Sequence, residues 1–379
     1  MRDERVAGEP VKVLVVSGIW PPDVGGPASH APEAAEFLLA RDHRVEVVTT
    51  ADAPPAPAPY PVHWIRRSLP LGVRHAATVA LVVRRAATHD VVYSTGMFGR
   101  SSLGAALART PLVVKLTADP AFERLRRWGG FRGSLEEFQR DRSLRTLPLR
   151  TLRDLDLRRA AHVITPSSYL RELVIGWGVP AARVTVLPNP LPTRRVDDLR
   201  PRDELRAELR LDGPTLVFAG RLTAQKSLDV GIEAARRAGI PLVVAGDGPD
   251  RPALERLGHA RFLGALPRER VLELLRAGDA MLLSSSWENF PHTVVESLAV
   301  GTPVLATRTG GVAEVVVDGE NGLLVEPGDA DALAAAIRRF VDDGPLAARL
   351  RANATASVAG YSAESVYGRL ERILRAAAR

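Results

Sequence analysis

Two glutamates spaced eight residues apart, Glu288 and Glu296, are the residues of this chain best suited to carry chemistry. The apolar run 280–283 before them ends in serines, which is typical of the carboxyl end of a buried parallel strand. Pro291 can open a helix without losing a hydrogen bond, and Gly301 can end it. We therefore expect Glu288 in a loop and Glu296 along the helix, with the free N–H groups of the helix start forming an anion site between them.

The stretch 287–291, Trp-Glu-Asn-Phe-Pro, followed by Gly-Thr-Pro at 301–303, resembles the signature of retaining glycosyltransferases of family four. That signature is a glutamate, seven residues and a second glutamate, and the family has the two-domain GT-B fold. The resemblance implies that Glu288 lies by the transferred sugar and that Glu296 hydrogen-bonds the donor ribose. The alternative is that both are solvated surface residues. The resemblance also implies donor contacts around the helix start, at Phe290, Pro291, Thr293 and Val294, with the N–H groups of the last two near the diphosphate.

Two basic residues, Arg221 and Lys226, follow the predicted strand 215–220. Sugar transfer from a nucleotide donor leaves a diphosphate, and fixed cations stabilise the charge that develops on it. Lys226 is one of only three lysines among 51 lysines and arginines. A lysine kept where nearly every other base is arginine indicates that this position needs a compact ammonium group. The resemblance implies that both residues contact the diphosphate and belong to the catalytic set. Otherwise each is an ordinary surface base.

The first half of the chain begins with a strand over 11–17, a glycine-rich loop at 21–27, a helix over 28–40 and a strand over 45–49. This order predicts a doubly wound α/β domain. By resemblance the loop faces the donor, and Gly26 is the best match. A plain tight turn is the alternative.

Asp119 follows the predicted strand 112–116, where such domains place residues that face a ligand, so it is a candidate catalytic residue. Many family members carry a histidine thereabouts, and 115–119 reads Lys-Leu-Thr-Ala-Asp instead. A second departure is Pro-Asn-Pro at 188–190, where Pro-Asn-Gly is usual. The identity of a general base therefore stays open.

The second half repeats the pattern of strand and glycine turn. The resemblance implies that the turn after the strand 241–245 lines the nucleoside through Gly246 and Gly248, together with Leu263. We expect an α/β protein of the GT-B fold with two Rossmann-like domains facing a central cleft. The expected parts are an acceptor-binding domain (1–192), a polar linker (190–212), a nucleotide-sugar-binding domain (193–360) and a last helix (361–379) that crosses back onto the first domain.

The composition is that of a soluble protein, with 46% hydrophobic residues, 25% charged residues and a net charge of +7 over 379 residues. Cysteine is absent, which excludes disulfides and cysteine nucleophiles. No apolar run is long enough for a membrane span, and the first residues lack the apolar region of a secretion signal, so we expect the cytoplasm. The scattered arginines and the absence of a recognition motif argue against nucleic-acid binding.

No Asp-x-Asp and no His/carboxylate cluster with ligand spacing is present, so we expect neither a metal nor a cofactor. An arginine-rich stretch with interleaved leucines and aromatics covers 123–159 and includes Trp128, Phe131 and Phe138. Such a surface can lie on anionic membrane at its cytoplasmic face, but an ordinary solvated face fits the pattern equally well.

The sequence thus predicts a metal-independent, retaining hexosyltransferase, which uses a UDP- or GDP-sugar. Its acceptor would be a hydroxyl of a glycan, a lipid-linked sugar or a small molecule such as a natural product. We favour departure and attack on the same face of the sugar, with the leaving phosphate taking the acceptor proton. Two alternatives remain, a nucleotide-sugar epimerase of the same architecture and a non-catalytic protein that binds nucleotide sugars.

Overall fold

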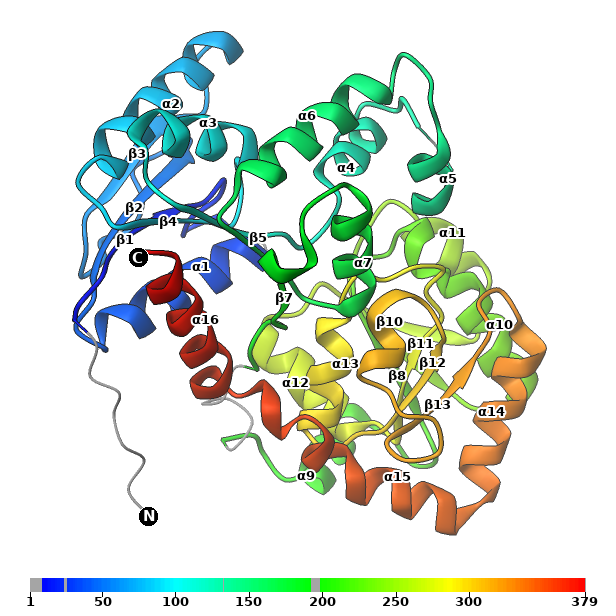
Figure 1. Ribbon diagram of the computed structural model, residues 1–379. Helices are drawn as coiled ribbons and strands as arrows, with labels where there is room; N and C mark the ends of the chain where they lie inside the picture. The colour runs from blue at the N-terminus through cyan, green and yellow to red at the C-terminus, as the bar shows by residue number, and fades with distance from the viewer. Residues whose placement is uncertain (1–8, 24–25, 132, 192–197, 379) are drawn as a thin grey trace. The chain divides into compact units, whose positions relative to one another are not determined.

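The computed structural model describes residues 9–23, 26–131, 133–191 and 198–378 of the chain. These residues form two compact units, each built around one parallel sheet (Figure 1). The first unit comprises Met1–Pro166, Leu170–Leu187 and Tyr367–Arg379, and the second comprises Ser167–Tyr169 and Pro188–Val366. The predicted domain boundary at 192/193 lies outside the described residues.

The sheet of the first unit has seven parallel strands in the order β3-β2-β1-β4-β5-β6-β7. Most of these strands are runs of Val, Leu and Ile with buried side chains, as expected of a sheet that is covered on both faces. The strand at the edge, β3, is only half buried and was not predicted. The strands are β1 (Lys12–Val16), β2 (Arg44–Ala51), β3 (Val62–Arg66), β4 (Val91–Ser94), β5 (Leu112–Lys115), β6 (His162–Thr165) and β7 (Val184–Val186).

Neighbouring side chains of β4 face opposite sides of this sheet. Val92 packs with Val82 of α2 and Leu157 of α6 in one apolar cluster, which also includes residues of α3 and α7. Tyr93 faces the other side, where its hydroxyl lies 2.9 Å from Nε2 of His30 in α1. The helices are α1 (Gly26–Leu39), α2 (Leu71–Ala86), α3 (Phe98–Ala108), α4 (Pro120–Arg127), α5 (Leu135–Arg140), α6 (Leu147–Arg159) and α7 (Ser168–Gly176), and a 3-10 turn, η1 (Ala181–Arg183), precedes β7.

The last helix, α16 (Ala363–Ala377), contacts the first unit, as predicted for its return to the amino-terminal half. The hydroxyl of Tyr367 donates to Oε2 of Glu33 in α1 at 3.1 Å. Glu371 lies 3.1 Å from Nε2 of the buried His43 and also forms a salt bridge with Arg375. These polar contacts fix α16 on the face of the sheet that α1 covers.

The sheet of the second unit has six parallel strands in the order β10-β9-β8-β11-β12-β13. Its central strands are completely buried, which agrees with the short apolar runs seen in the sequence. The strands are β8 (Leu216–Ala219), β9 (Leu242–Ala245), β10 (Ala260–Gly264), β11 (Ala280–Leu283), β12 (Val304–Thr307) and β13 (Gly322–Val325).

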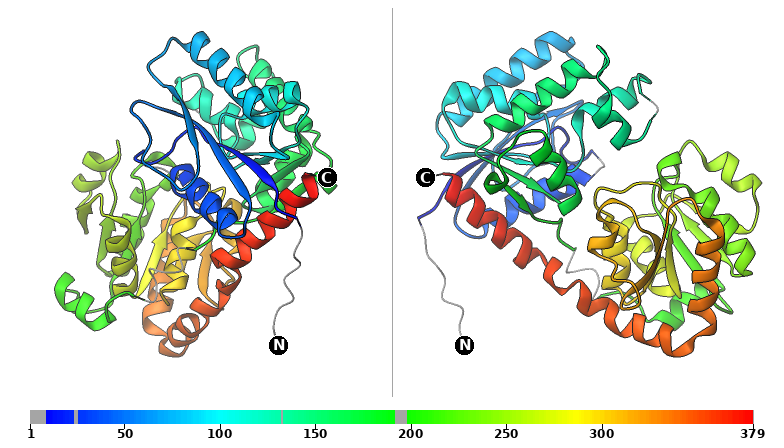
Figure 2. Two further views of the ribbon diagram at one scale, coloured as in Figure 1. Left: turned by 90° about the vertical axis from the view of Figure 1, so that its left-hand side faces the viewer. Right: turned by 45° about the vertical axis from the view of Figure 1, so that its right-hand side comes forward.

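Helices cover both faces of this second sheet (Figure 2). Val217 packs with side chains of α9, α12 and α13, whereas Phe218 packs with those of α10, α11 and α14. The helices are α9 (Arg202–Leu209), α10 (Leu228–Ala238), α11 (Arg251–Arg256), α12 (Arg268–Ala277), α13 (His292–Ala299), α14 (Ala330–Asp342) and α15 (Gly344–Ser357). Short 3-10 turns are η2 (Ala224–Lys226), η3 (Gly310–Glu314) and η4 (Ala359–Tyr361).

The predicted linker over 190–212 is wrong in part, because it contains the helix α9. Leu205 of this helix is 1% exposed in the core of the second unit. Salt bridges from Arg202 and Arg206 to Asp279 tie α9 to the loop before β11. The polar composition of this stretch therefore reflects ion pairs on the surface of a packed helix. No helix in the described part of the chain has the length and apolar character needed to cross a membrane.

Both sheets reverse their strand order next to the first strand of the unit, between β1 and β4 and between β8 and β11. Connections that leave neighbouring strands toward opposite faces open a crevice at the carboxyl ends of those strands. In the second unit the residues that follow β8 and β11 include Lys226 and Glu288. The fold therefore brings the two chemically promising segments to one edge of the second sheet.

Candidate donor and catalytic site

The loops after β8 and β11 meet through an ion pair between Lys226 and Glu288. The ammonium Nζ donates to Oε1 of the carboxylate at 2.5 Å, and the hydroxyl of Ser285 donates to the same oxygen at 2.7 Å. The side chains of Glu288 and Lys226 are 6% and 17% exposed. Gln225 strengthens the junction by donating to the carbonyl of Trp287 and accepting from the N–H of Ser286. The strand-end switch point is thus occupied by a largely buried, opposite-charge pair.

Two glycines after β12 hold the backbone that carries Glu288. A Cβ on Gly310 would lie 1.7 Å from the carbonyl oxygen of Glu288, and one on Gly311 would lie 2.4 Å from that of Asn289. The N–H of Gly311 donates to the Glu288 carbonyl at 3.1 Å. Gly310 also has a φ of +48°, which glycine adopts without steric cost. Any larger residue at either position would displace the loop of Glu288.

The turns after β8 and β9 pack against each other just as tightly. A Cβ on Gly246 would lie 1.8 Å from the carbonyl oxygen of Gly220, and one on Gly248 would lie 2.1 Å from that of Leu222. The N–H of Gly246 donates to the carbonyl of Gly264 in β10 at 2.8 Å. Gly246 and Gly248 therefore lie at the same sheet edge as the ion pair.

Arg221 and Leu263 lie next to these close-packed glycine turns. Arg221 follows Gly220 directly and is exposed, so its guanidinium is available to a ligand. Leu263, in β10, is partly buried against the core.

The residues at the start of α13 divide into core and surface positions. Phe290 is 9% exposed and stacks on Tyr361 with ring centroids 6.1 Å apart, so its side chain anchors the loop rather than lining an open site. Pro291 and Val294 are buried too, and the N–H of Val294 donates to the Pro291 carbonyl at 3.0 Å. Of the two N–H groups expected near the diphosphate, the one of Val294 is thus already engaged. Thr293 is half-buried at the first turn.

Glu296 lies in the middle of α13 and is paired with Arg268 at the start of α12. Nη2 and Nε of the arginine donate to the same carboxylate oxygen, Oε1, at 2.7 and 3.1 Å. Burial raises the pKa of the Glu296 carboxyl, and the nearby guanidinium partly opposes that increase. From the described residues, the other oxygen Oε2 accepts no hydrogen bond, and the same holds for Oε2 of Glu288. Each glutamate is fixed through one oxygen and has the second available for a ligand.

Asp119 and Gly26 belong to the first unit. The carboxylate of Asp119 is buried and caps α4 by accepting from the N–H groups of Ala121 and Phe122. Its second oxygen accepts from Gln139 and forms a close ion pair with Arg153. These contacts give Asp119 a structural role, and its proposed catalytic role stays a prediction. Gly26 is the first residue of α1, and Gly25 lies outside the described residues.

Three contributors to this site were missed by sequence reasoning. Arg268 lies 28 residues before its partner, and only its place directly after Pro267 at a helix start distinguishes it from the other arginines. Ser285 belongs to the serine run after β11, of which only one member reaches Glu288. Gly310 and Gly311 form a glycine pair after β12, and this pair was a signal that could have been used. In the part of the chain that the structure describes, no group of three or more His, Asp or Glu side chains is arranged to hold a metal ion.

Family models match both units of the chain. Residues 25–190 match the "glycosyl transferase 4-like domain" and residues 201–357 match "glycosyl transferases group 1". The chain is 34% identical to a lipopolysaccharide core biosynthesis glycosyltransferase, LpsE, of Rhizobium meliloti, over 53% of this chain and 60% of that protein. It is 32% identical to an alpha-D-kanosaminyltransferase of Streptomyces kanamyceticus, over 46% of this chain and 49% of that protein. The chain thus spans about half the length of these relatives.

The fold has close counterparts among solved structures. The structure of Anabaena Alr3699/HepE in complex with UDP and glucose superimposes with a TM-score of 0.77, covering 97% of this chain and all of that one at 22% identity. This likeness establishes the GT-B fold. Together with the two family models on the two units, it shows that the chain belongs to the group 1 glycosyltransferases, family four, of the GT-B fold.

Proposed function

We propose that this protein transfers a hexose-type sugar from a nucleotide diphosphate sugar, with UDP or GDP as the nucleotide, to a hydroxyl group, with retention of configuration at the anomeric carbon. The observation that carries the proposal is the pair of glutamates at the edge of the second sheet. Glu288 is held by Lys226, and Glu296 is held by Arg268, each through a single oxygen. Such an arrangement suits a donor that presents hydroxyl groups together with a diphosphate.

The cations at this edge serve the leaving group. When the bond between the anomeric carbon and the diphosphate oxygen breaks, the bonding electrons go to that oxygen and negative charge grows on the diphosphate. Lys226 uses one of its three N–H donors on Glu288, so two remain for phosphate oxygens. Arg221 is exposed next to the glycine turn and can pair with the same group. Fixed cations of this kind stabilise the transition state without a metal ion.

The acceptor attacks on the face from which the diphosphate departs. The acceptor oxygen forms the new bond to the anomeric carbon, and its proton passes to the departing phosphate oxygen. Glu288 stands by the transferred sugar and stabilises positive charge on the ring through its second oxygen. Because Glu288 also fixes the ammonium of Lys226, it holds the cation for the leaving group in position before the donor arrives.

Glu296 binds the ribose of the donor. Hydroxyl groups of a ribose donate to a carboxylate oxygen, and Oε2 accepts no hydrogen bond from the described residues. The turn with Gly246 and Gly248, which packs closely against the turn after β8, presents its backbone to the nucleoside. The N–H of Thr293 completes the contacts near the phosphates.

The acceptor has two supported classes. One relative is named for lipopolysaccharide core biosynthesis and another as a D-inositol 3-phosphate glycosyltransferase, so a lipid-linked glycan and a small molecule both have a precedent. In favour of the first class, the described part of the arginine-rich stretch exposes apolar side chains beside its bases. Leu144 is 89% exposed and Trp128 is 69% exposed. A surface of this composition suits reversible contact with anionic lipid at the cytoplasmic face of a membrane.

The donor is tested by a thermal-shift panel of UDP-, GDP- and ADP-sugars on the full chain. We expect one nucleotide series to raise the melting temperature, and the rise should be smaller in Glu296→Gln. A matched variant, Glu320→Gln, changes an exposed glutamate of the same unit and should keep it. The absence of a rise with any nucleotide sugar would contradict the proposal.

Turnover then separates transfer from other reactions of the same donor. With the bound nucleotide sugar and an acceptor, we expect transfer to continue in excess chelator. Complete loss of transfer that Mg²⁺ restores would overturn the metal-independent chemistry. Conversion of the nucleotide sugar to its epimer without an acceptor would identify an epimerase instead.

A further inference from the structure

A cavity of about 710 Å³ lies in the first unit, and none of the residues assigned to the donor is among those that line it. It is bounded by α2, α3, α4 and α6, and by the residues that directly follow two strands. Thr95 comes after β4, and Thr117 comes after β5, so the cavity opens at the carboxyl edge of the first sheet. This edge is where doubly wound domains bind ligands.

The charge of the cavity is positive. Five arginines and two carboxylates line it, and four of the arginines, Arg100, Arg124, Arg127 and Arg159, form no salt bridge with a described residue. Burial lowers the pKa of Arg100 to about 10, and repulsion from Arg74 and Arg124 contributes to that decrease. A desolvated guanidinium beside other cations is a place where an anion gains free energy on binding.

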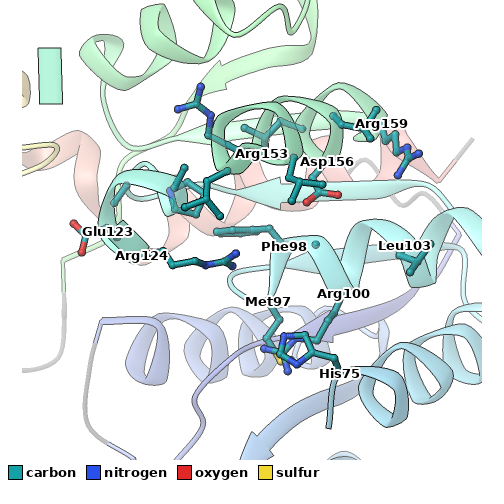
Figure 3. A pocket seen from close by; sticks show the side chains of 18 of the residues that line it. His75, Met97, Phe98, Arg100, Leu103, Glu123, Arg124, Arg153, Asp156 and Arg159 are labelled. Carbon is teal, nitrogen blue, oxygen red and sulfur yellow. The ribbon is translucent and has the colours of Figure 1, made fainter. Parts of the chain in front are cut away.

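The remaining charged groups do not cancel this excess. Arg153 is already neutralised by Asp119 and Asp154. Figure 3 shows that Arg124 extends toward the space beside the ring of Phe98, whereas Glu123 points away from that space. Asp156 remains as a carboxylate in the wall, and burial raises its pKa, so its charge is itself disfavoured.

Part of the cavity wall is apolar. Phe98 lines it together with three leucines whose side chains are unusually accessible. Leu103, Leu152 and Leu155 are 44%, 57% and 44% exposed. Apolar side chains that stand open at a ligand-binding edge are suited to covering an apolar group of a ligand.

We propose that this cavity binds an amphipathic anion, namely a phosphate ester or diester that carries an apolar group. The phosphate lies between Arg100 and Arg124, and the apolar group lies against Phe98 and the exposed leucines. Guanidinium groups bind phosphate oxygens through paired N–H donors, so they recognise the geometry of the phosphate as well as its charge. The inference rests on the proposed function in one respect: it assigns this ligand to the acceptor side of the transfer.

Binding is measured directly by calorimetry, with the full chain, without donor, and with dodecyl phosphate below its micelle concentration. We expect the double variant Arg100→Gln/Arg124→Gln to bind dodecyl phosphate at least about tenfold more weakly than the wild type, because hydrogen bonds to a charged group are lost. The control is Arg126→Gln, which removes one positive charge from the helix that carries Arg124. The Arg126 side chain stacks on Phe122 and does not line the cavity. It should stay within about twofold of the wild type.

Two comparisons define the chemistry of the ligand. Octyl glucoside, which is apolar but neutral, and inorganic phosphate, which is anionic but not apolar, should each bind much more weakly than dodecyl phosphate. Co-sedimentation with phosphatidylglycerol vesicles identifies the source of the ligand. Vesicle binding that depends on Arg124 but not on Arg126 indicates a lipid headgroup, and binding of dodecyl phosphate alone indicates a soluble phosphate ester. Both results support the shared chemistry.

The proposal is overturned if the wild type does not bind dodecyl phosphate, or if Arg126→Gln weakens binding as much as the double variant does. Retention of the thermal shift with the nucleotide sugar shows that the double variant is folded. If the wild type shows no such shift but binds dodecyl phosphate, the assignment of the donor fails while the cavity stands as a binding site. If the shift is present and dodecyl phosphate does not bind, only the cavity proposal fails.

Discussion

The second unit holds its functional loops rigidly, whereas the first unit leaves much of its arginine-rich segment open. In the second unit, a Cβ at Gly246 or Gly310 would come within 1.8 Å or 1.7 Å of a backbone oxygen. In the first unit, a Cβ at Gly129 would meet no atom within 4 Å, and Leu144 is 89% exposed. The comparison indicates that backbone contacts fix the loops around the Lys226–Glu288 ion pair, whereas part of the arginine-rich segment is held by few contacts.

The largest effect should come from Glu288, because two loops depend on its carboxylate. Glu288→Gln removes the charge that fixes Lys226 and that stabilises the transferred sugar. We expect the turnover number to fall by about 10²–10³-fold, the usual cost of removing one electrostatic group at a reaction centre. Initial-rate kinetics give the turnover number, and calorimetry with the nucleoside diphosphate gives the affinity.

Affinity for the bare nucleoside diphosphate should change much less than turnover in this variant, because Glu288 itself acts on the sugar and Lys226 keeps its charge for the diphosphate. A loss of affinity as large as the loss of turnover would show that Glu288 mainly binds the donor. Such a result would remove the division of roles between Glu288 and Glu296.

The comparison itself is tested by placing alanine at one glycine in each unit. Gly246→Ala forces a φ of +146° on alanine and presses its Cβ against the Gly220 carbonyl. We expect it to lose roughly 3 kcal/mol of unfolding free energy or more. Gly129→Ala, at a φ of +68° in open space, should lose only about 1 kcal/mol. Urea unfolding measures both, and equal losses would refute the contrast between rigid and open loops.

The difference between the units also explains what the sequence could reveal. The segment that carries Glu288 and Glu296 was predictable, because its buried strand, its loop carboxylate and its helix start are all encoded by neighbouring residues within 280–301. The two sheets were predictable in the same way, because most strands are short apolar runs, and the structure confirms them. It also confirms the return of the last helix to the first unit. Arg268 could not be predicted, because it meets Glu296 only through the packing of α12 beside α13.

The first unit was harder to interpret from local pattern. Phe138 belongs to the arginine-rich stretch and was expected on its surface, but it is completely buried against Phe122 and Phe131. Arg153 could not be distinguished in the sequence from the other arginines of this stretch. In the structure it is buried, pairs with Asp119 and stacks on Trp177. Long-range packing decides which residues of the arginine-rich stretch face solvent, and this packing cannot be inferred from the composition of the stretch.

A smaller effect is expected at Glu296. Glu296→Gln should weaken binding of the nucleotide sugar by about 1–3 kcal/mol, because a hydrogen bond to a charged acceptor is replaced by one to a neutral amide. The effect should also depend on pH. Burial raises the pKa of this carboxyl, so it takes up a proton at a higher pH than a free glutamate does. Its ionised form, the better acceptor, is present above that pKa and is lost as the pH falls through it.

Affinity of the wild type should therefore decrease as the pH is lowered from 7, and affinity of Glu296→Gln should decrease less. A nucleotide sugar is the suitable probe, since its diphosphate is esterified at both ends and has no ionisation near pH 6, unlike a terminal phosphate. Calorimetry across this pH range measures both proteins. Parallel pH curves for the two would show that Glu296 does not contact the nucleotide.

The last prediction concerns the open surface of the first unit and its contact with lipid. Arg142 and Arg145 are exposed beside Leu144 and lie outside the phosphate cavity. Each arginine near an anionic surface contributes about 1 kcal/mol, so Arg142→Ser/Arg145→Ser should weaken co-sedimentation with acidic vesicles by about 2 kcal/mol at low salt. Arg256→Ser/Arg339→Ser removes the same charge from exposed positions of the second unit and should leave vesicle binding close to that of the wild type. Higher salt should reduce the difference, because surface charges are then screened. If the wild type remains in the supernatant even at low salt, the open surface has no membrane role and the acceptor should be sought among soluble molecules.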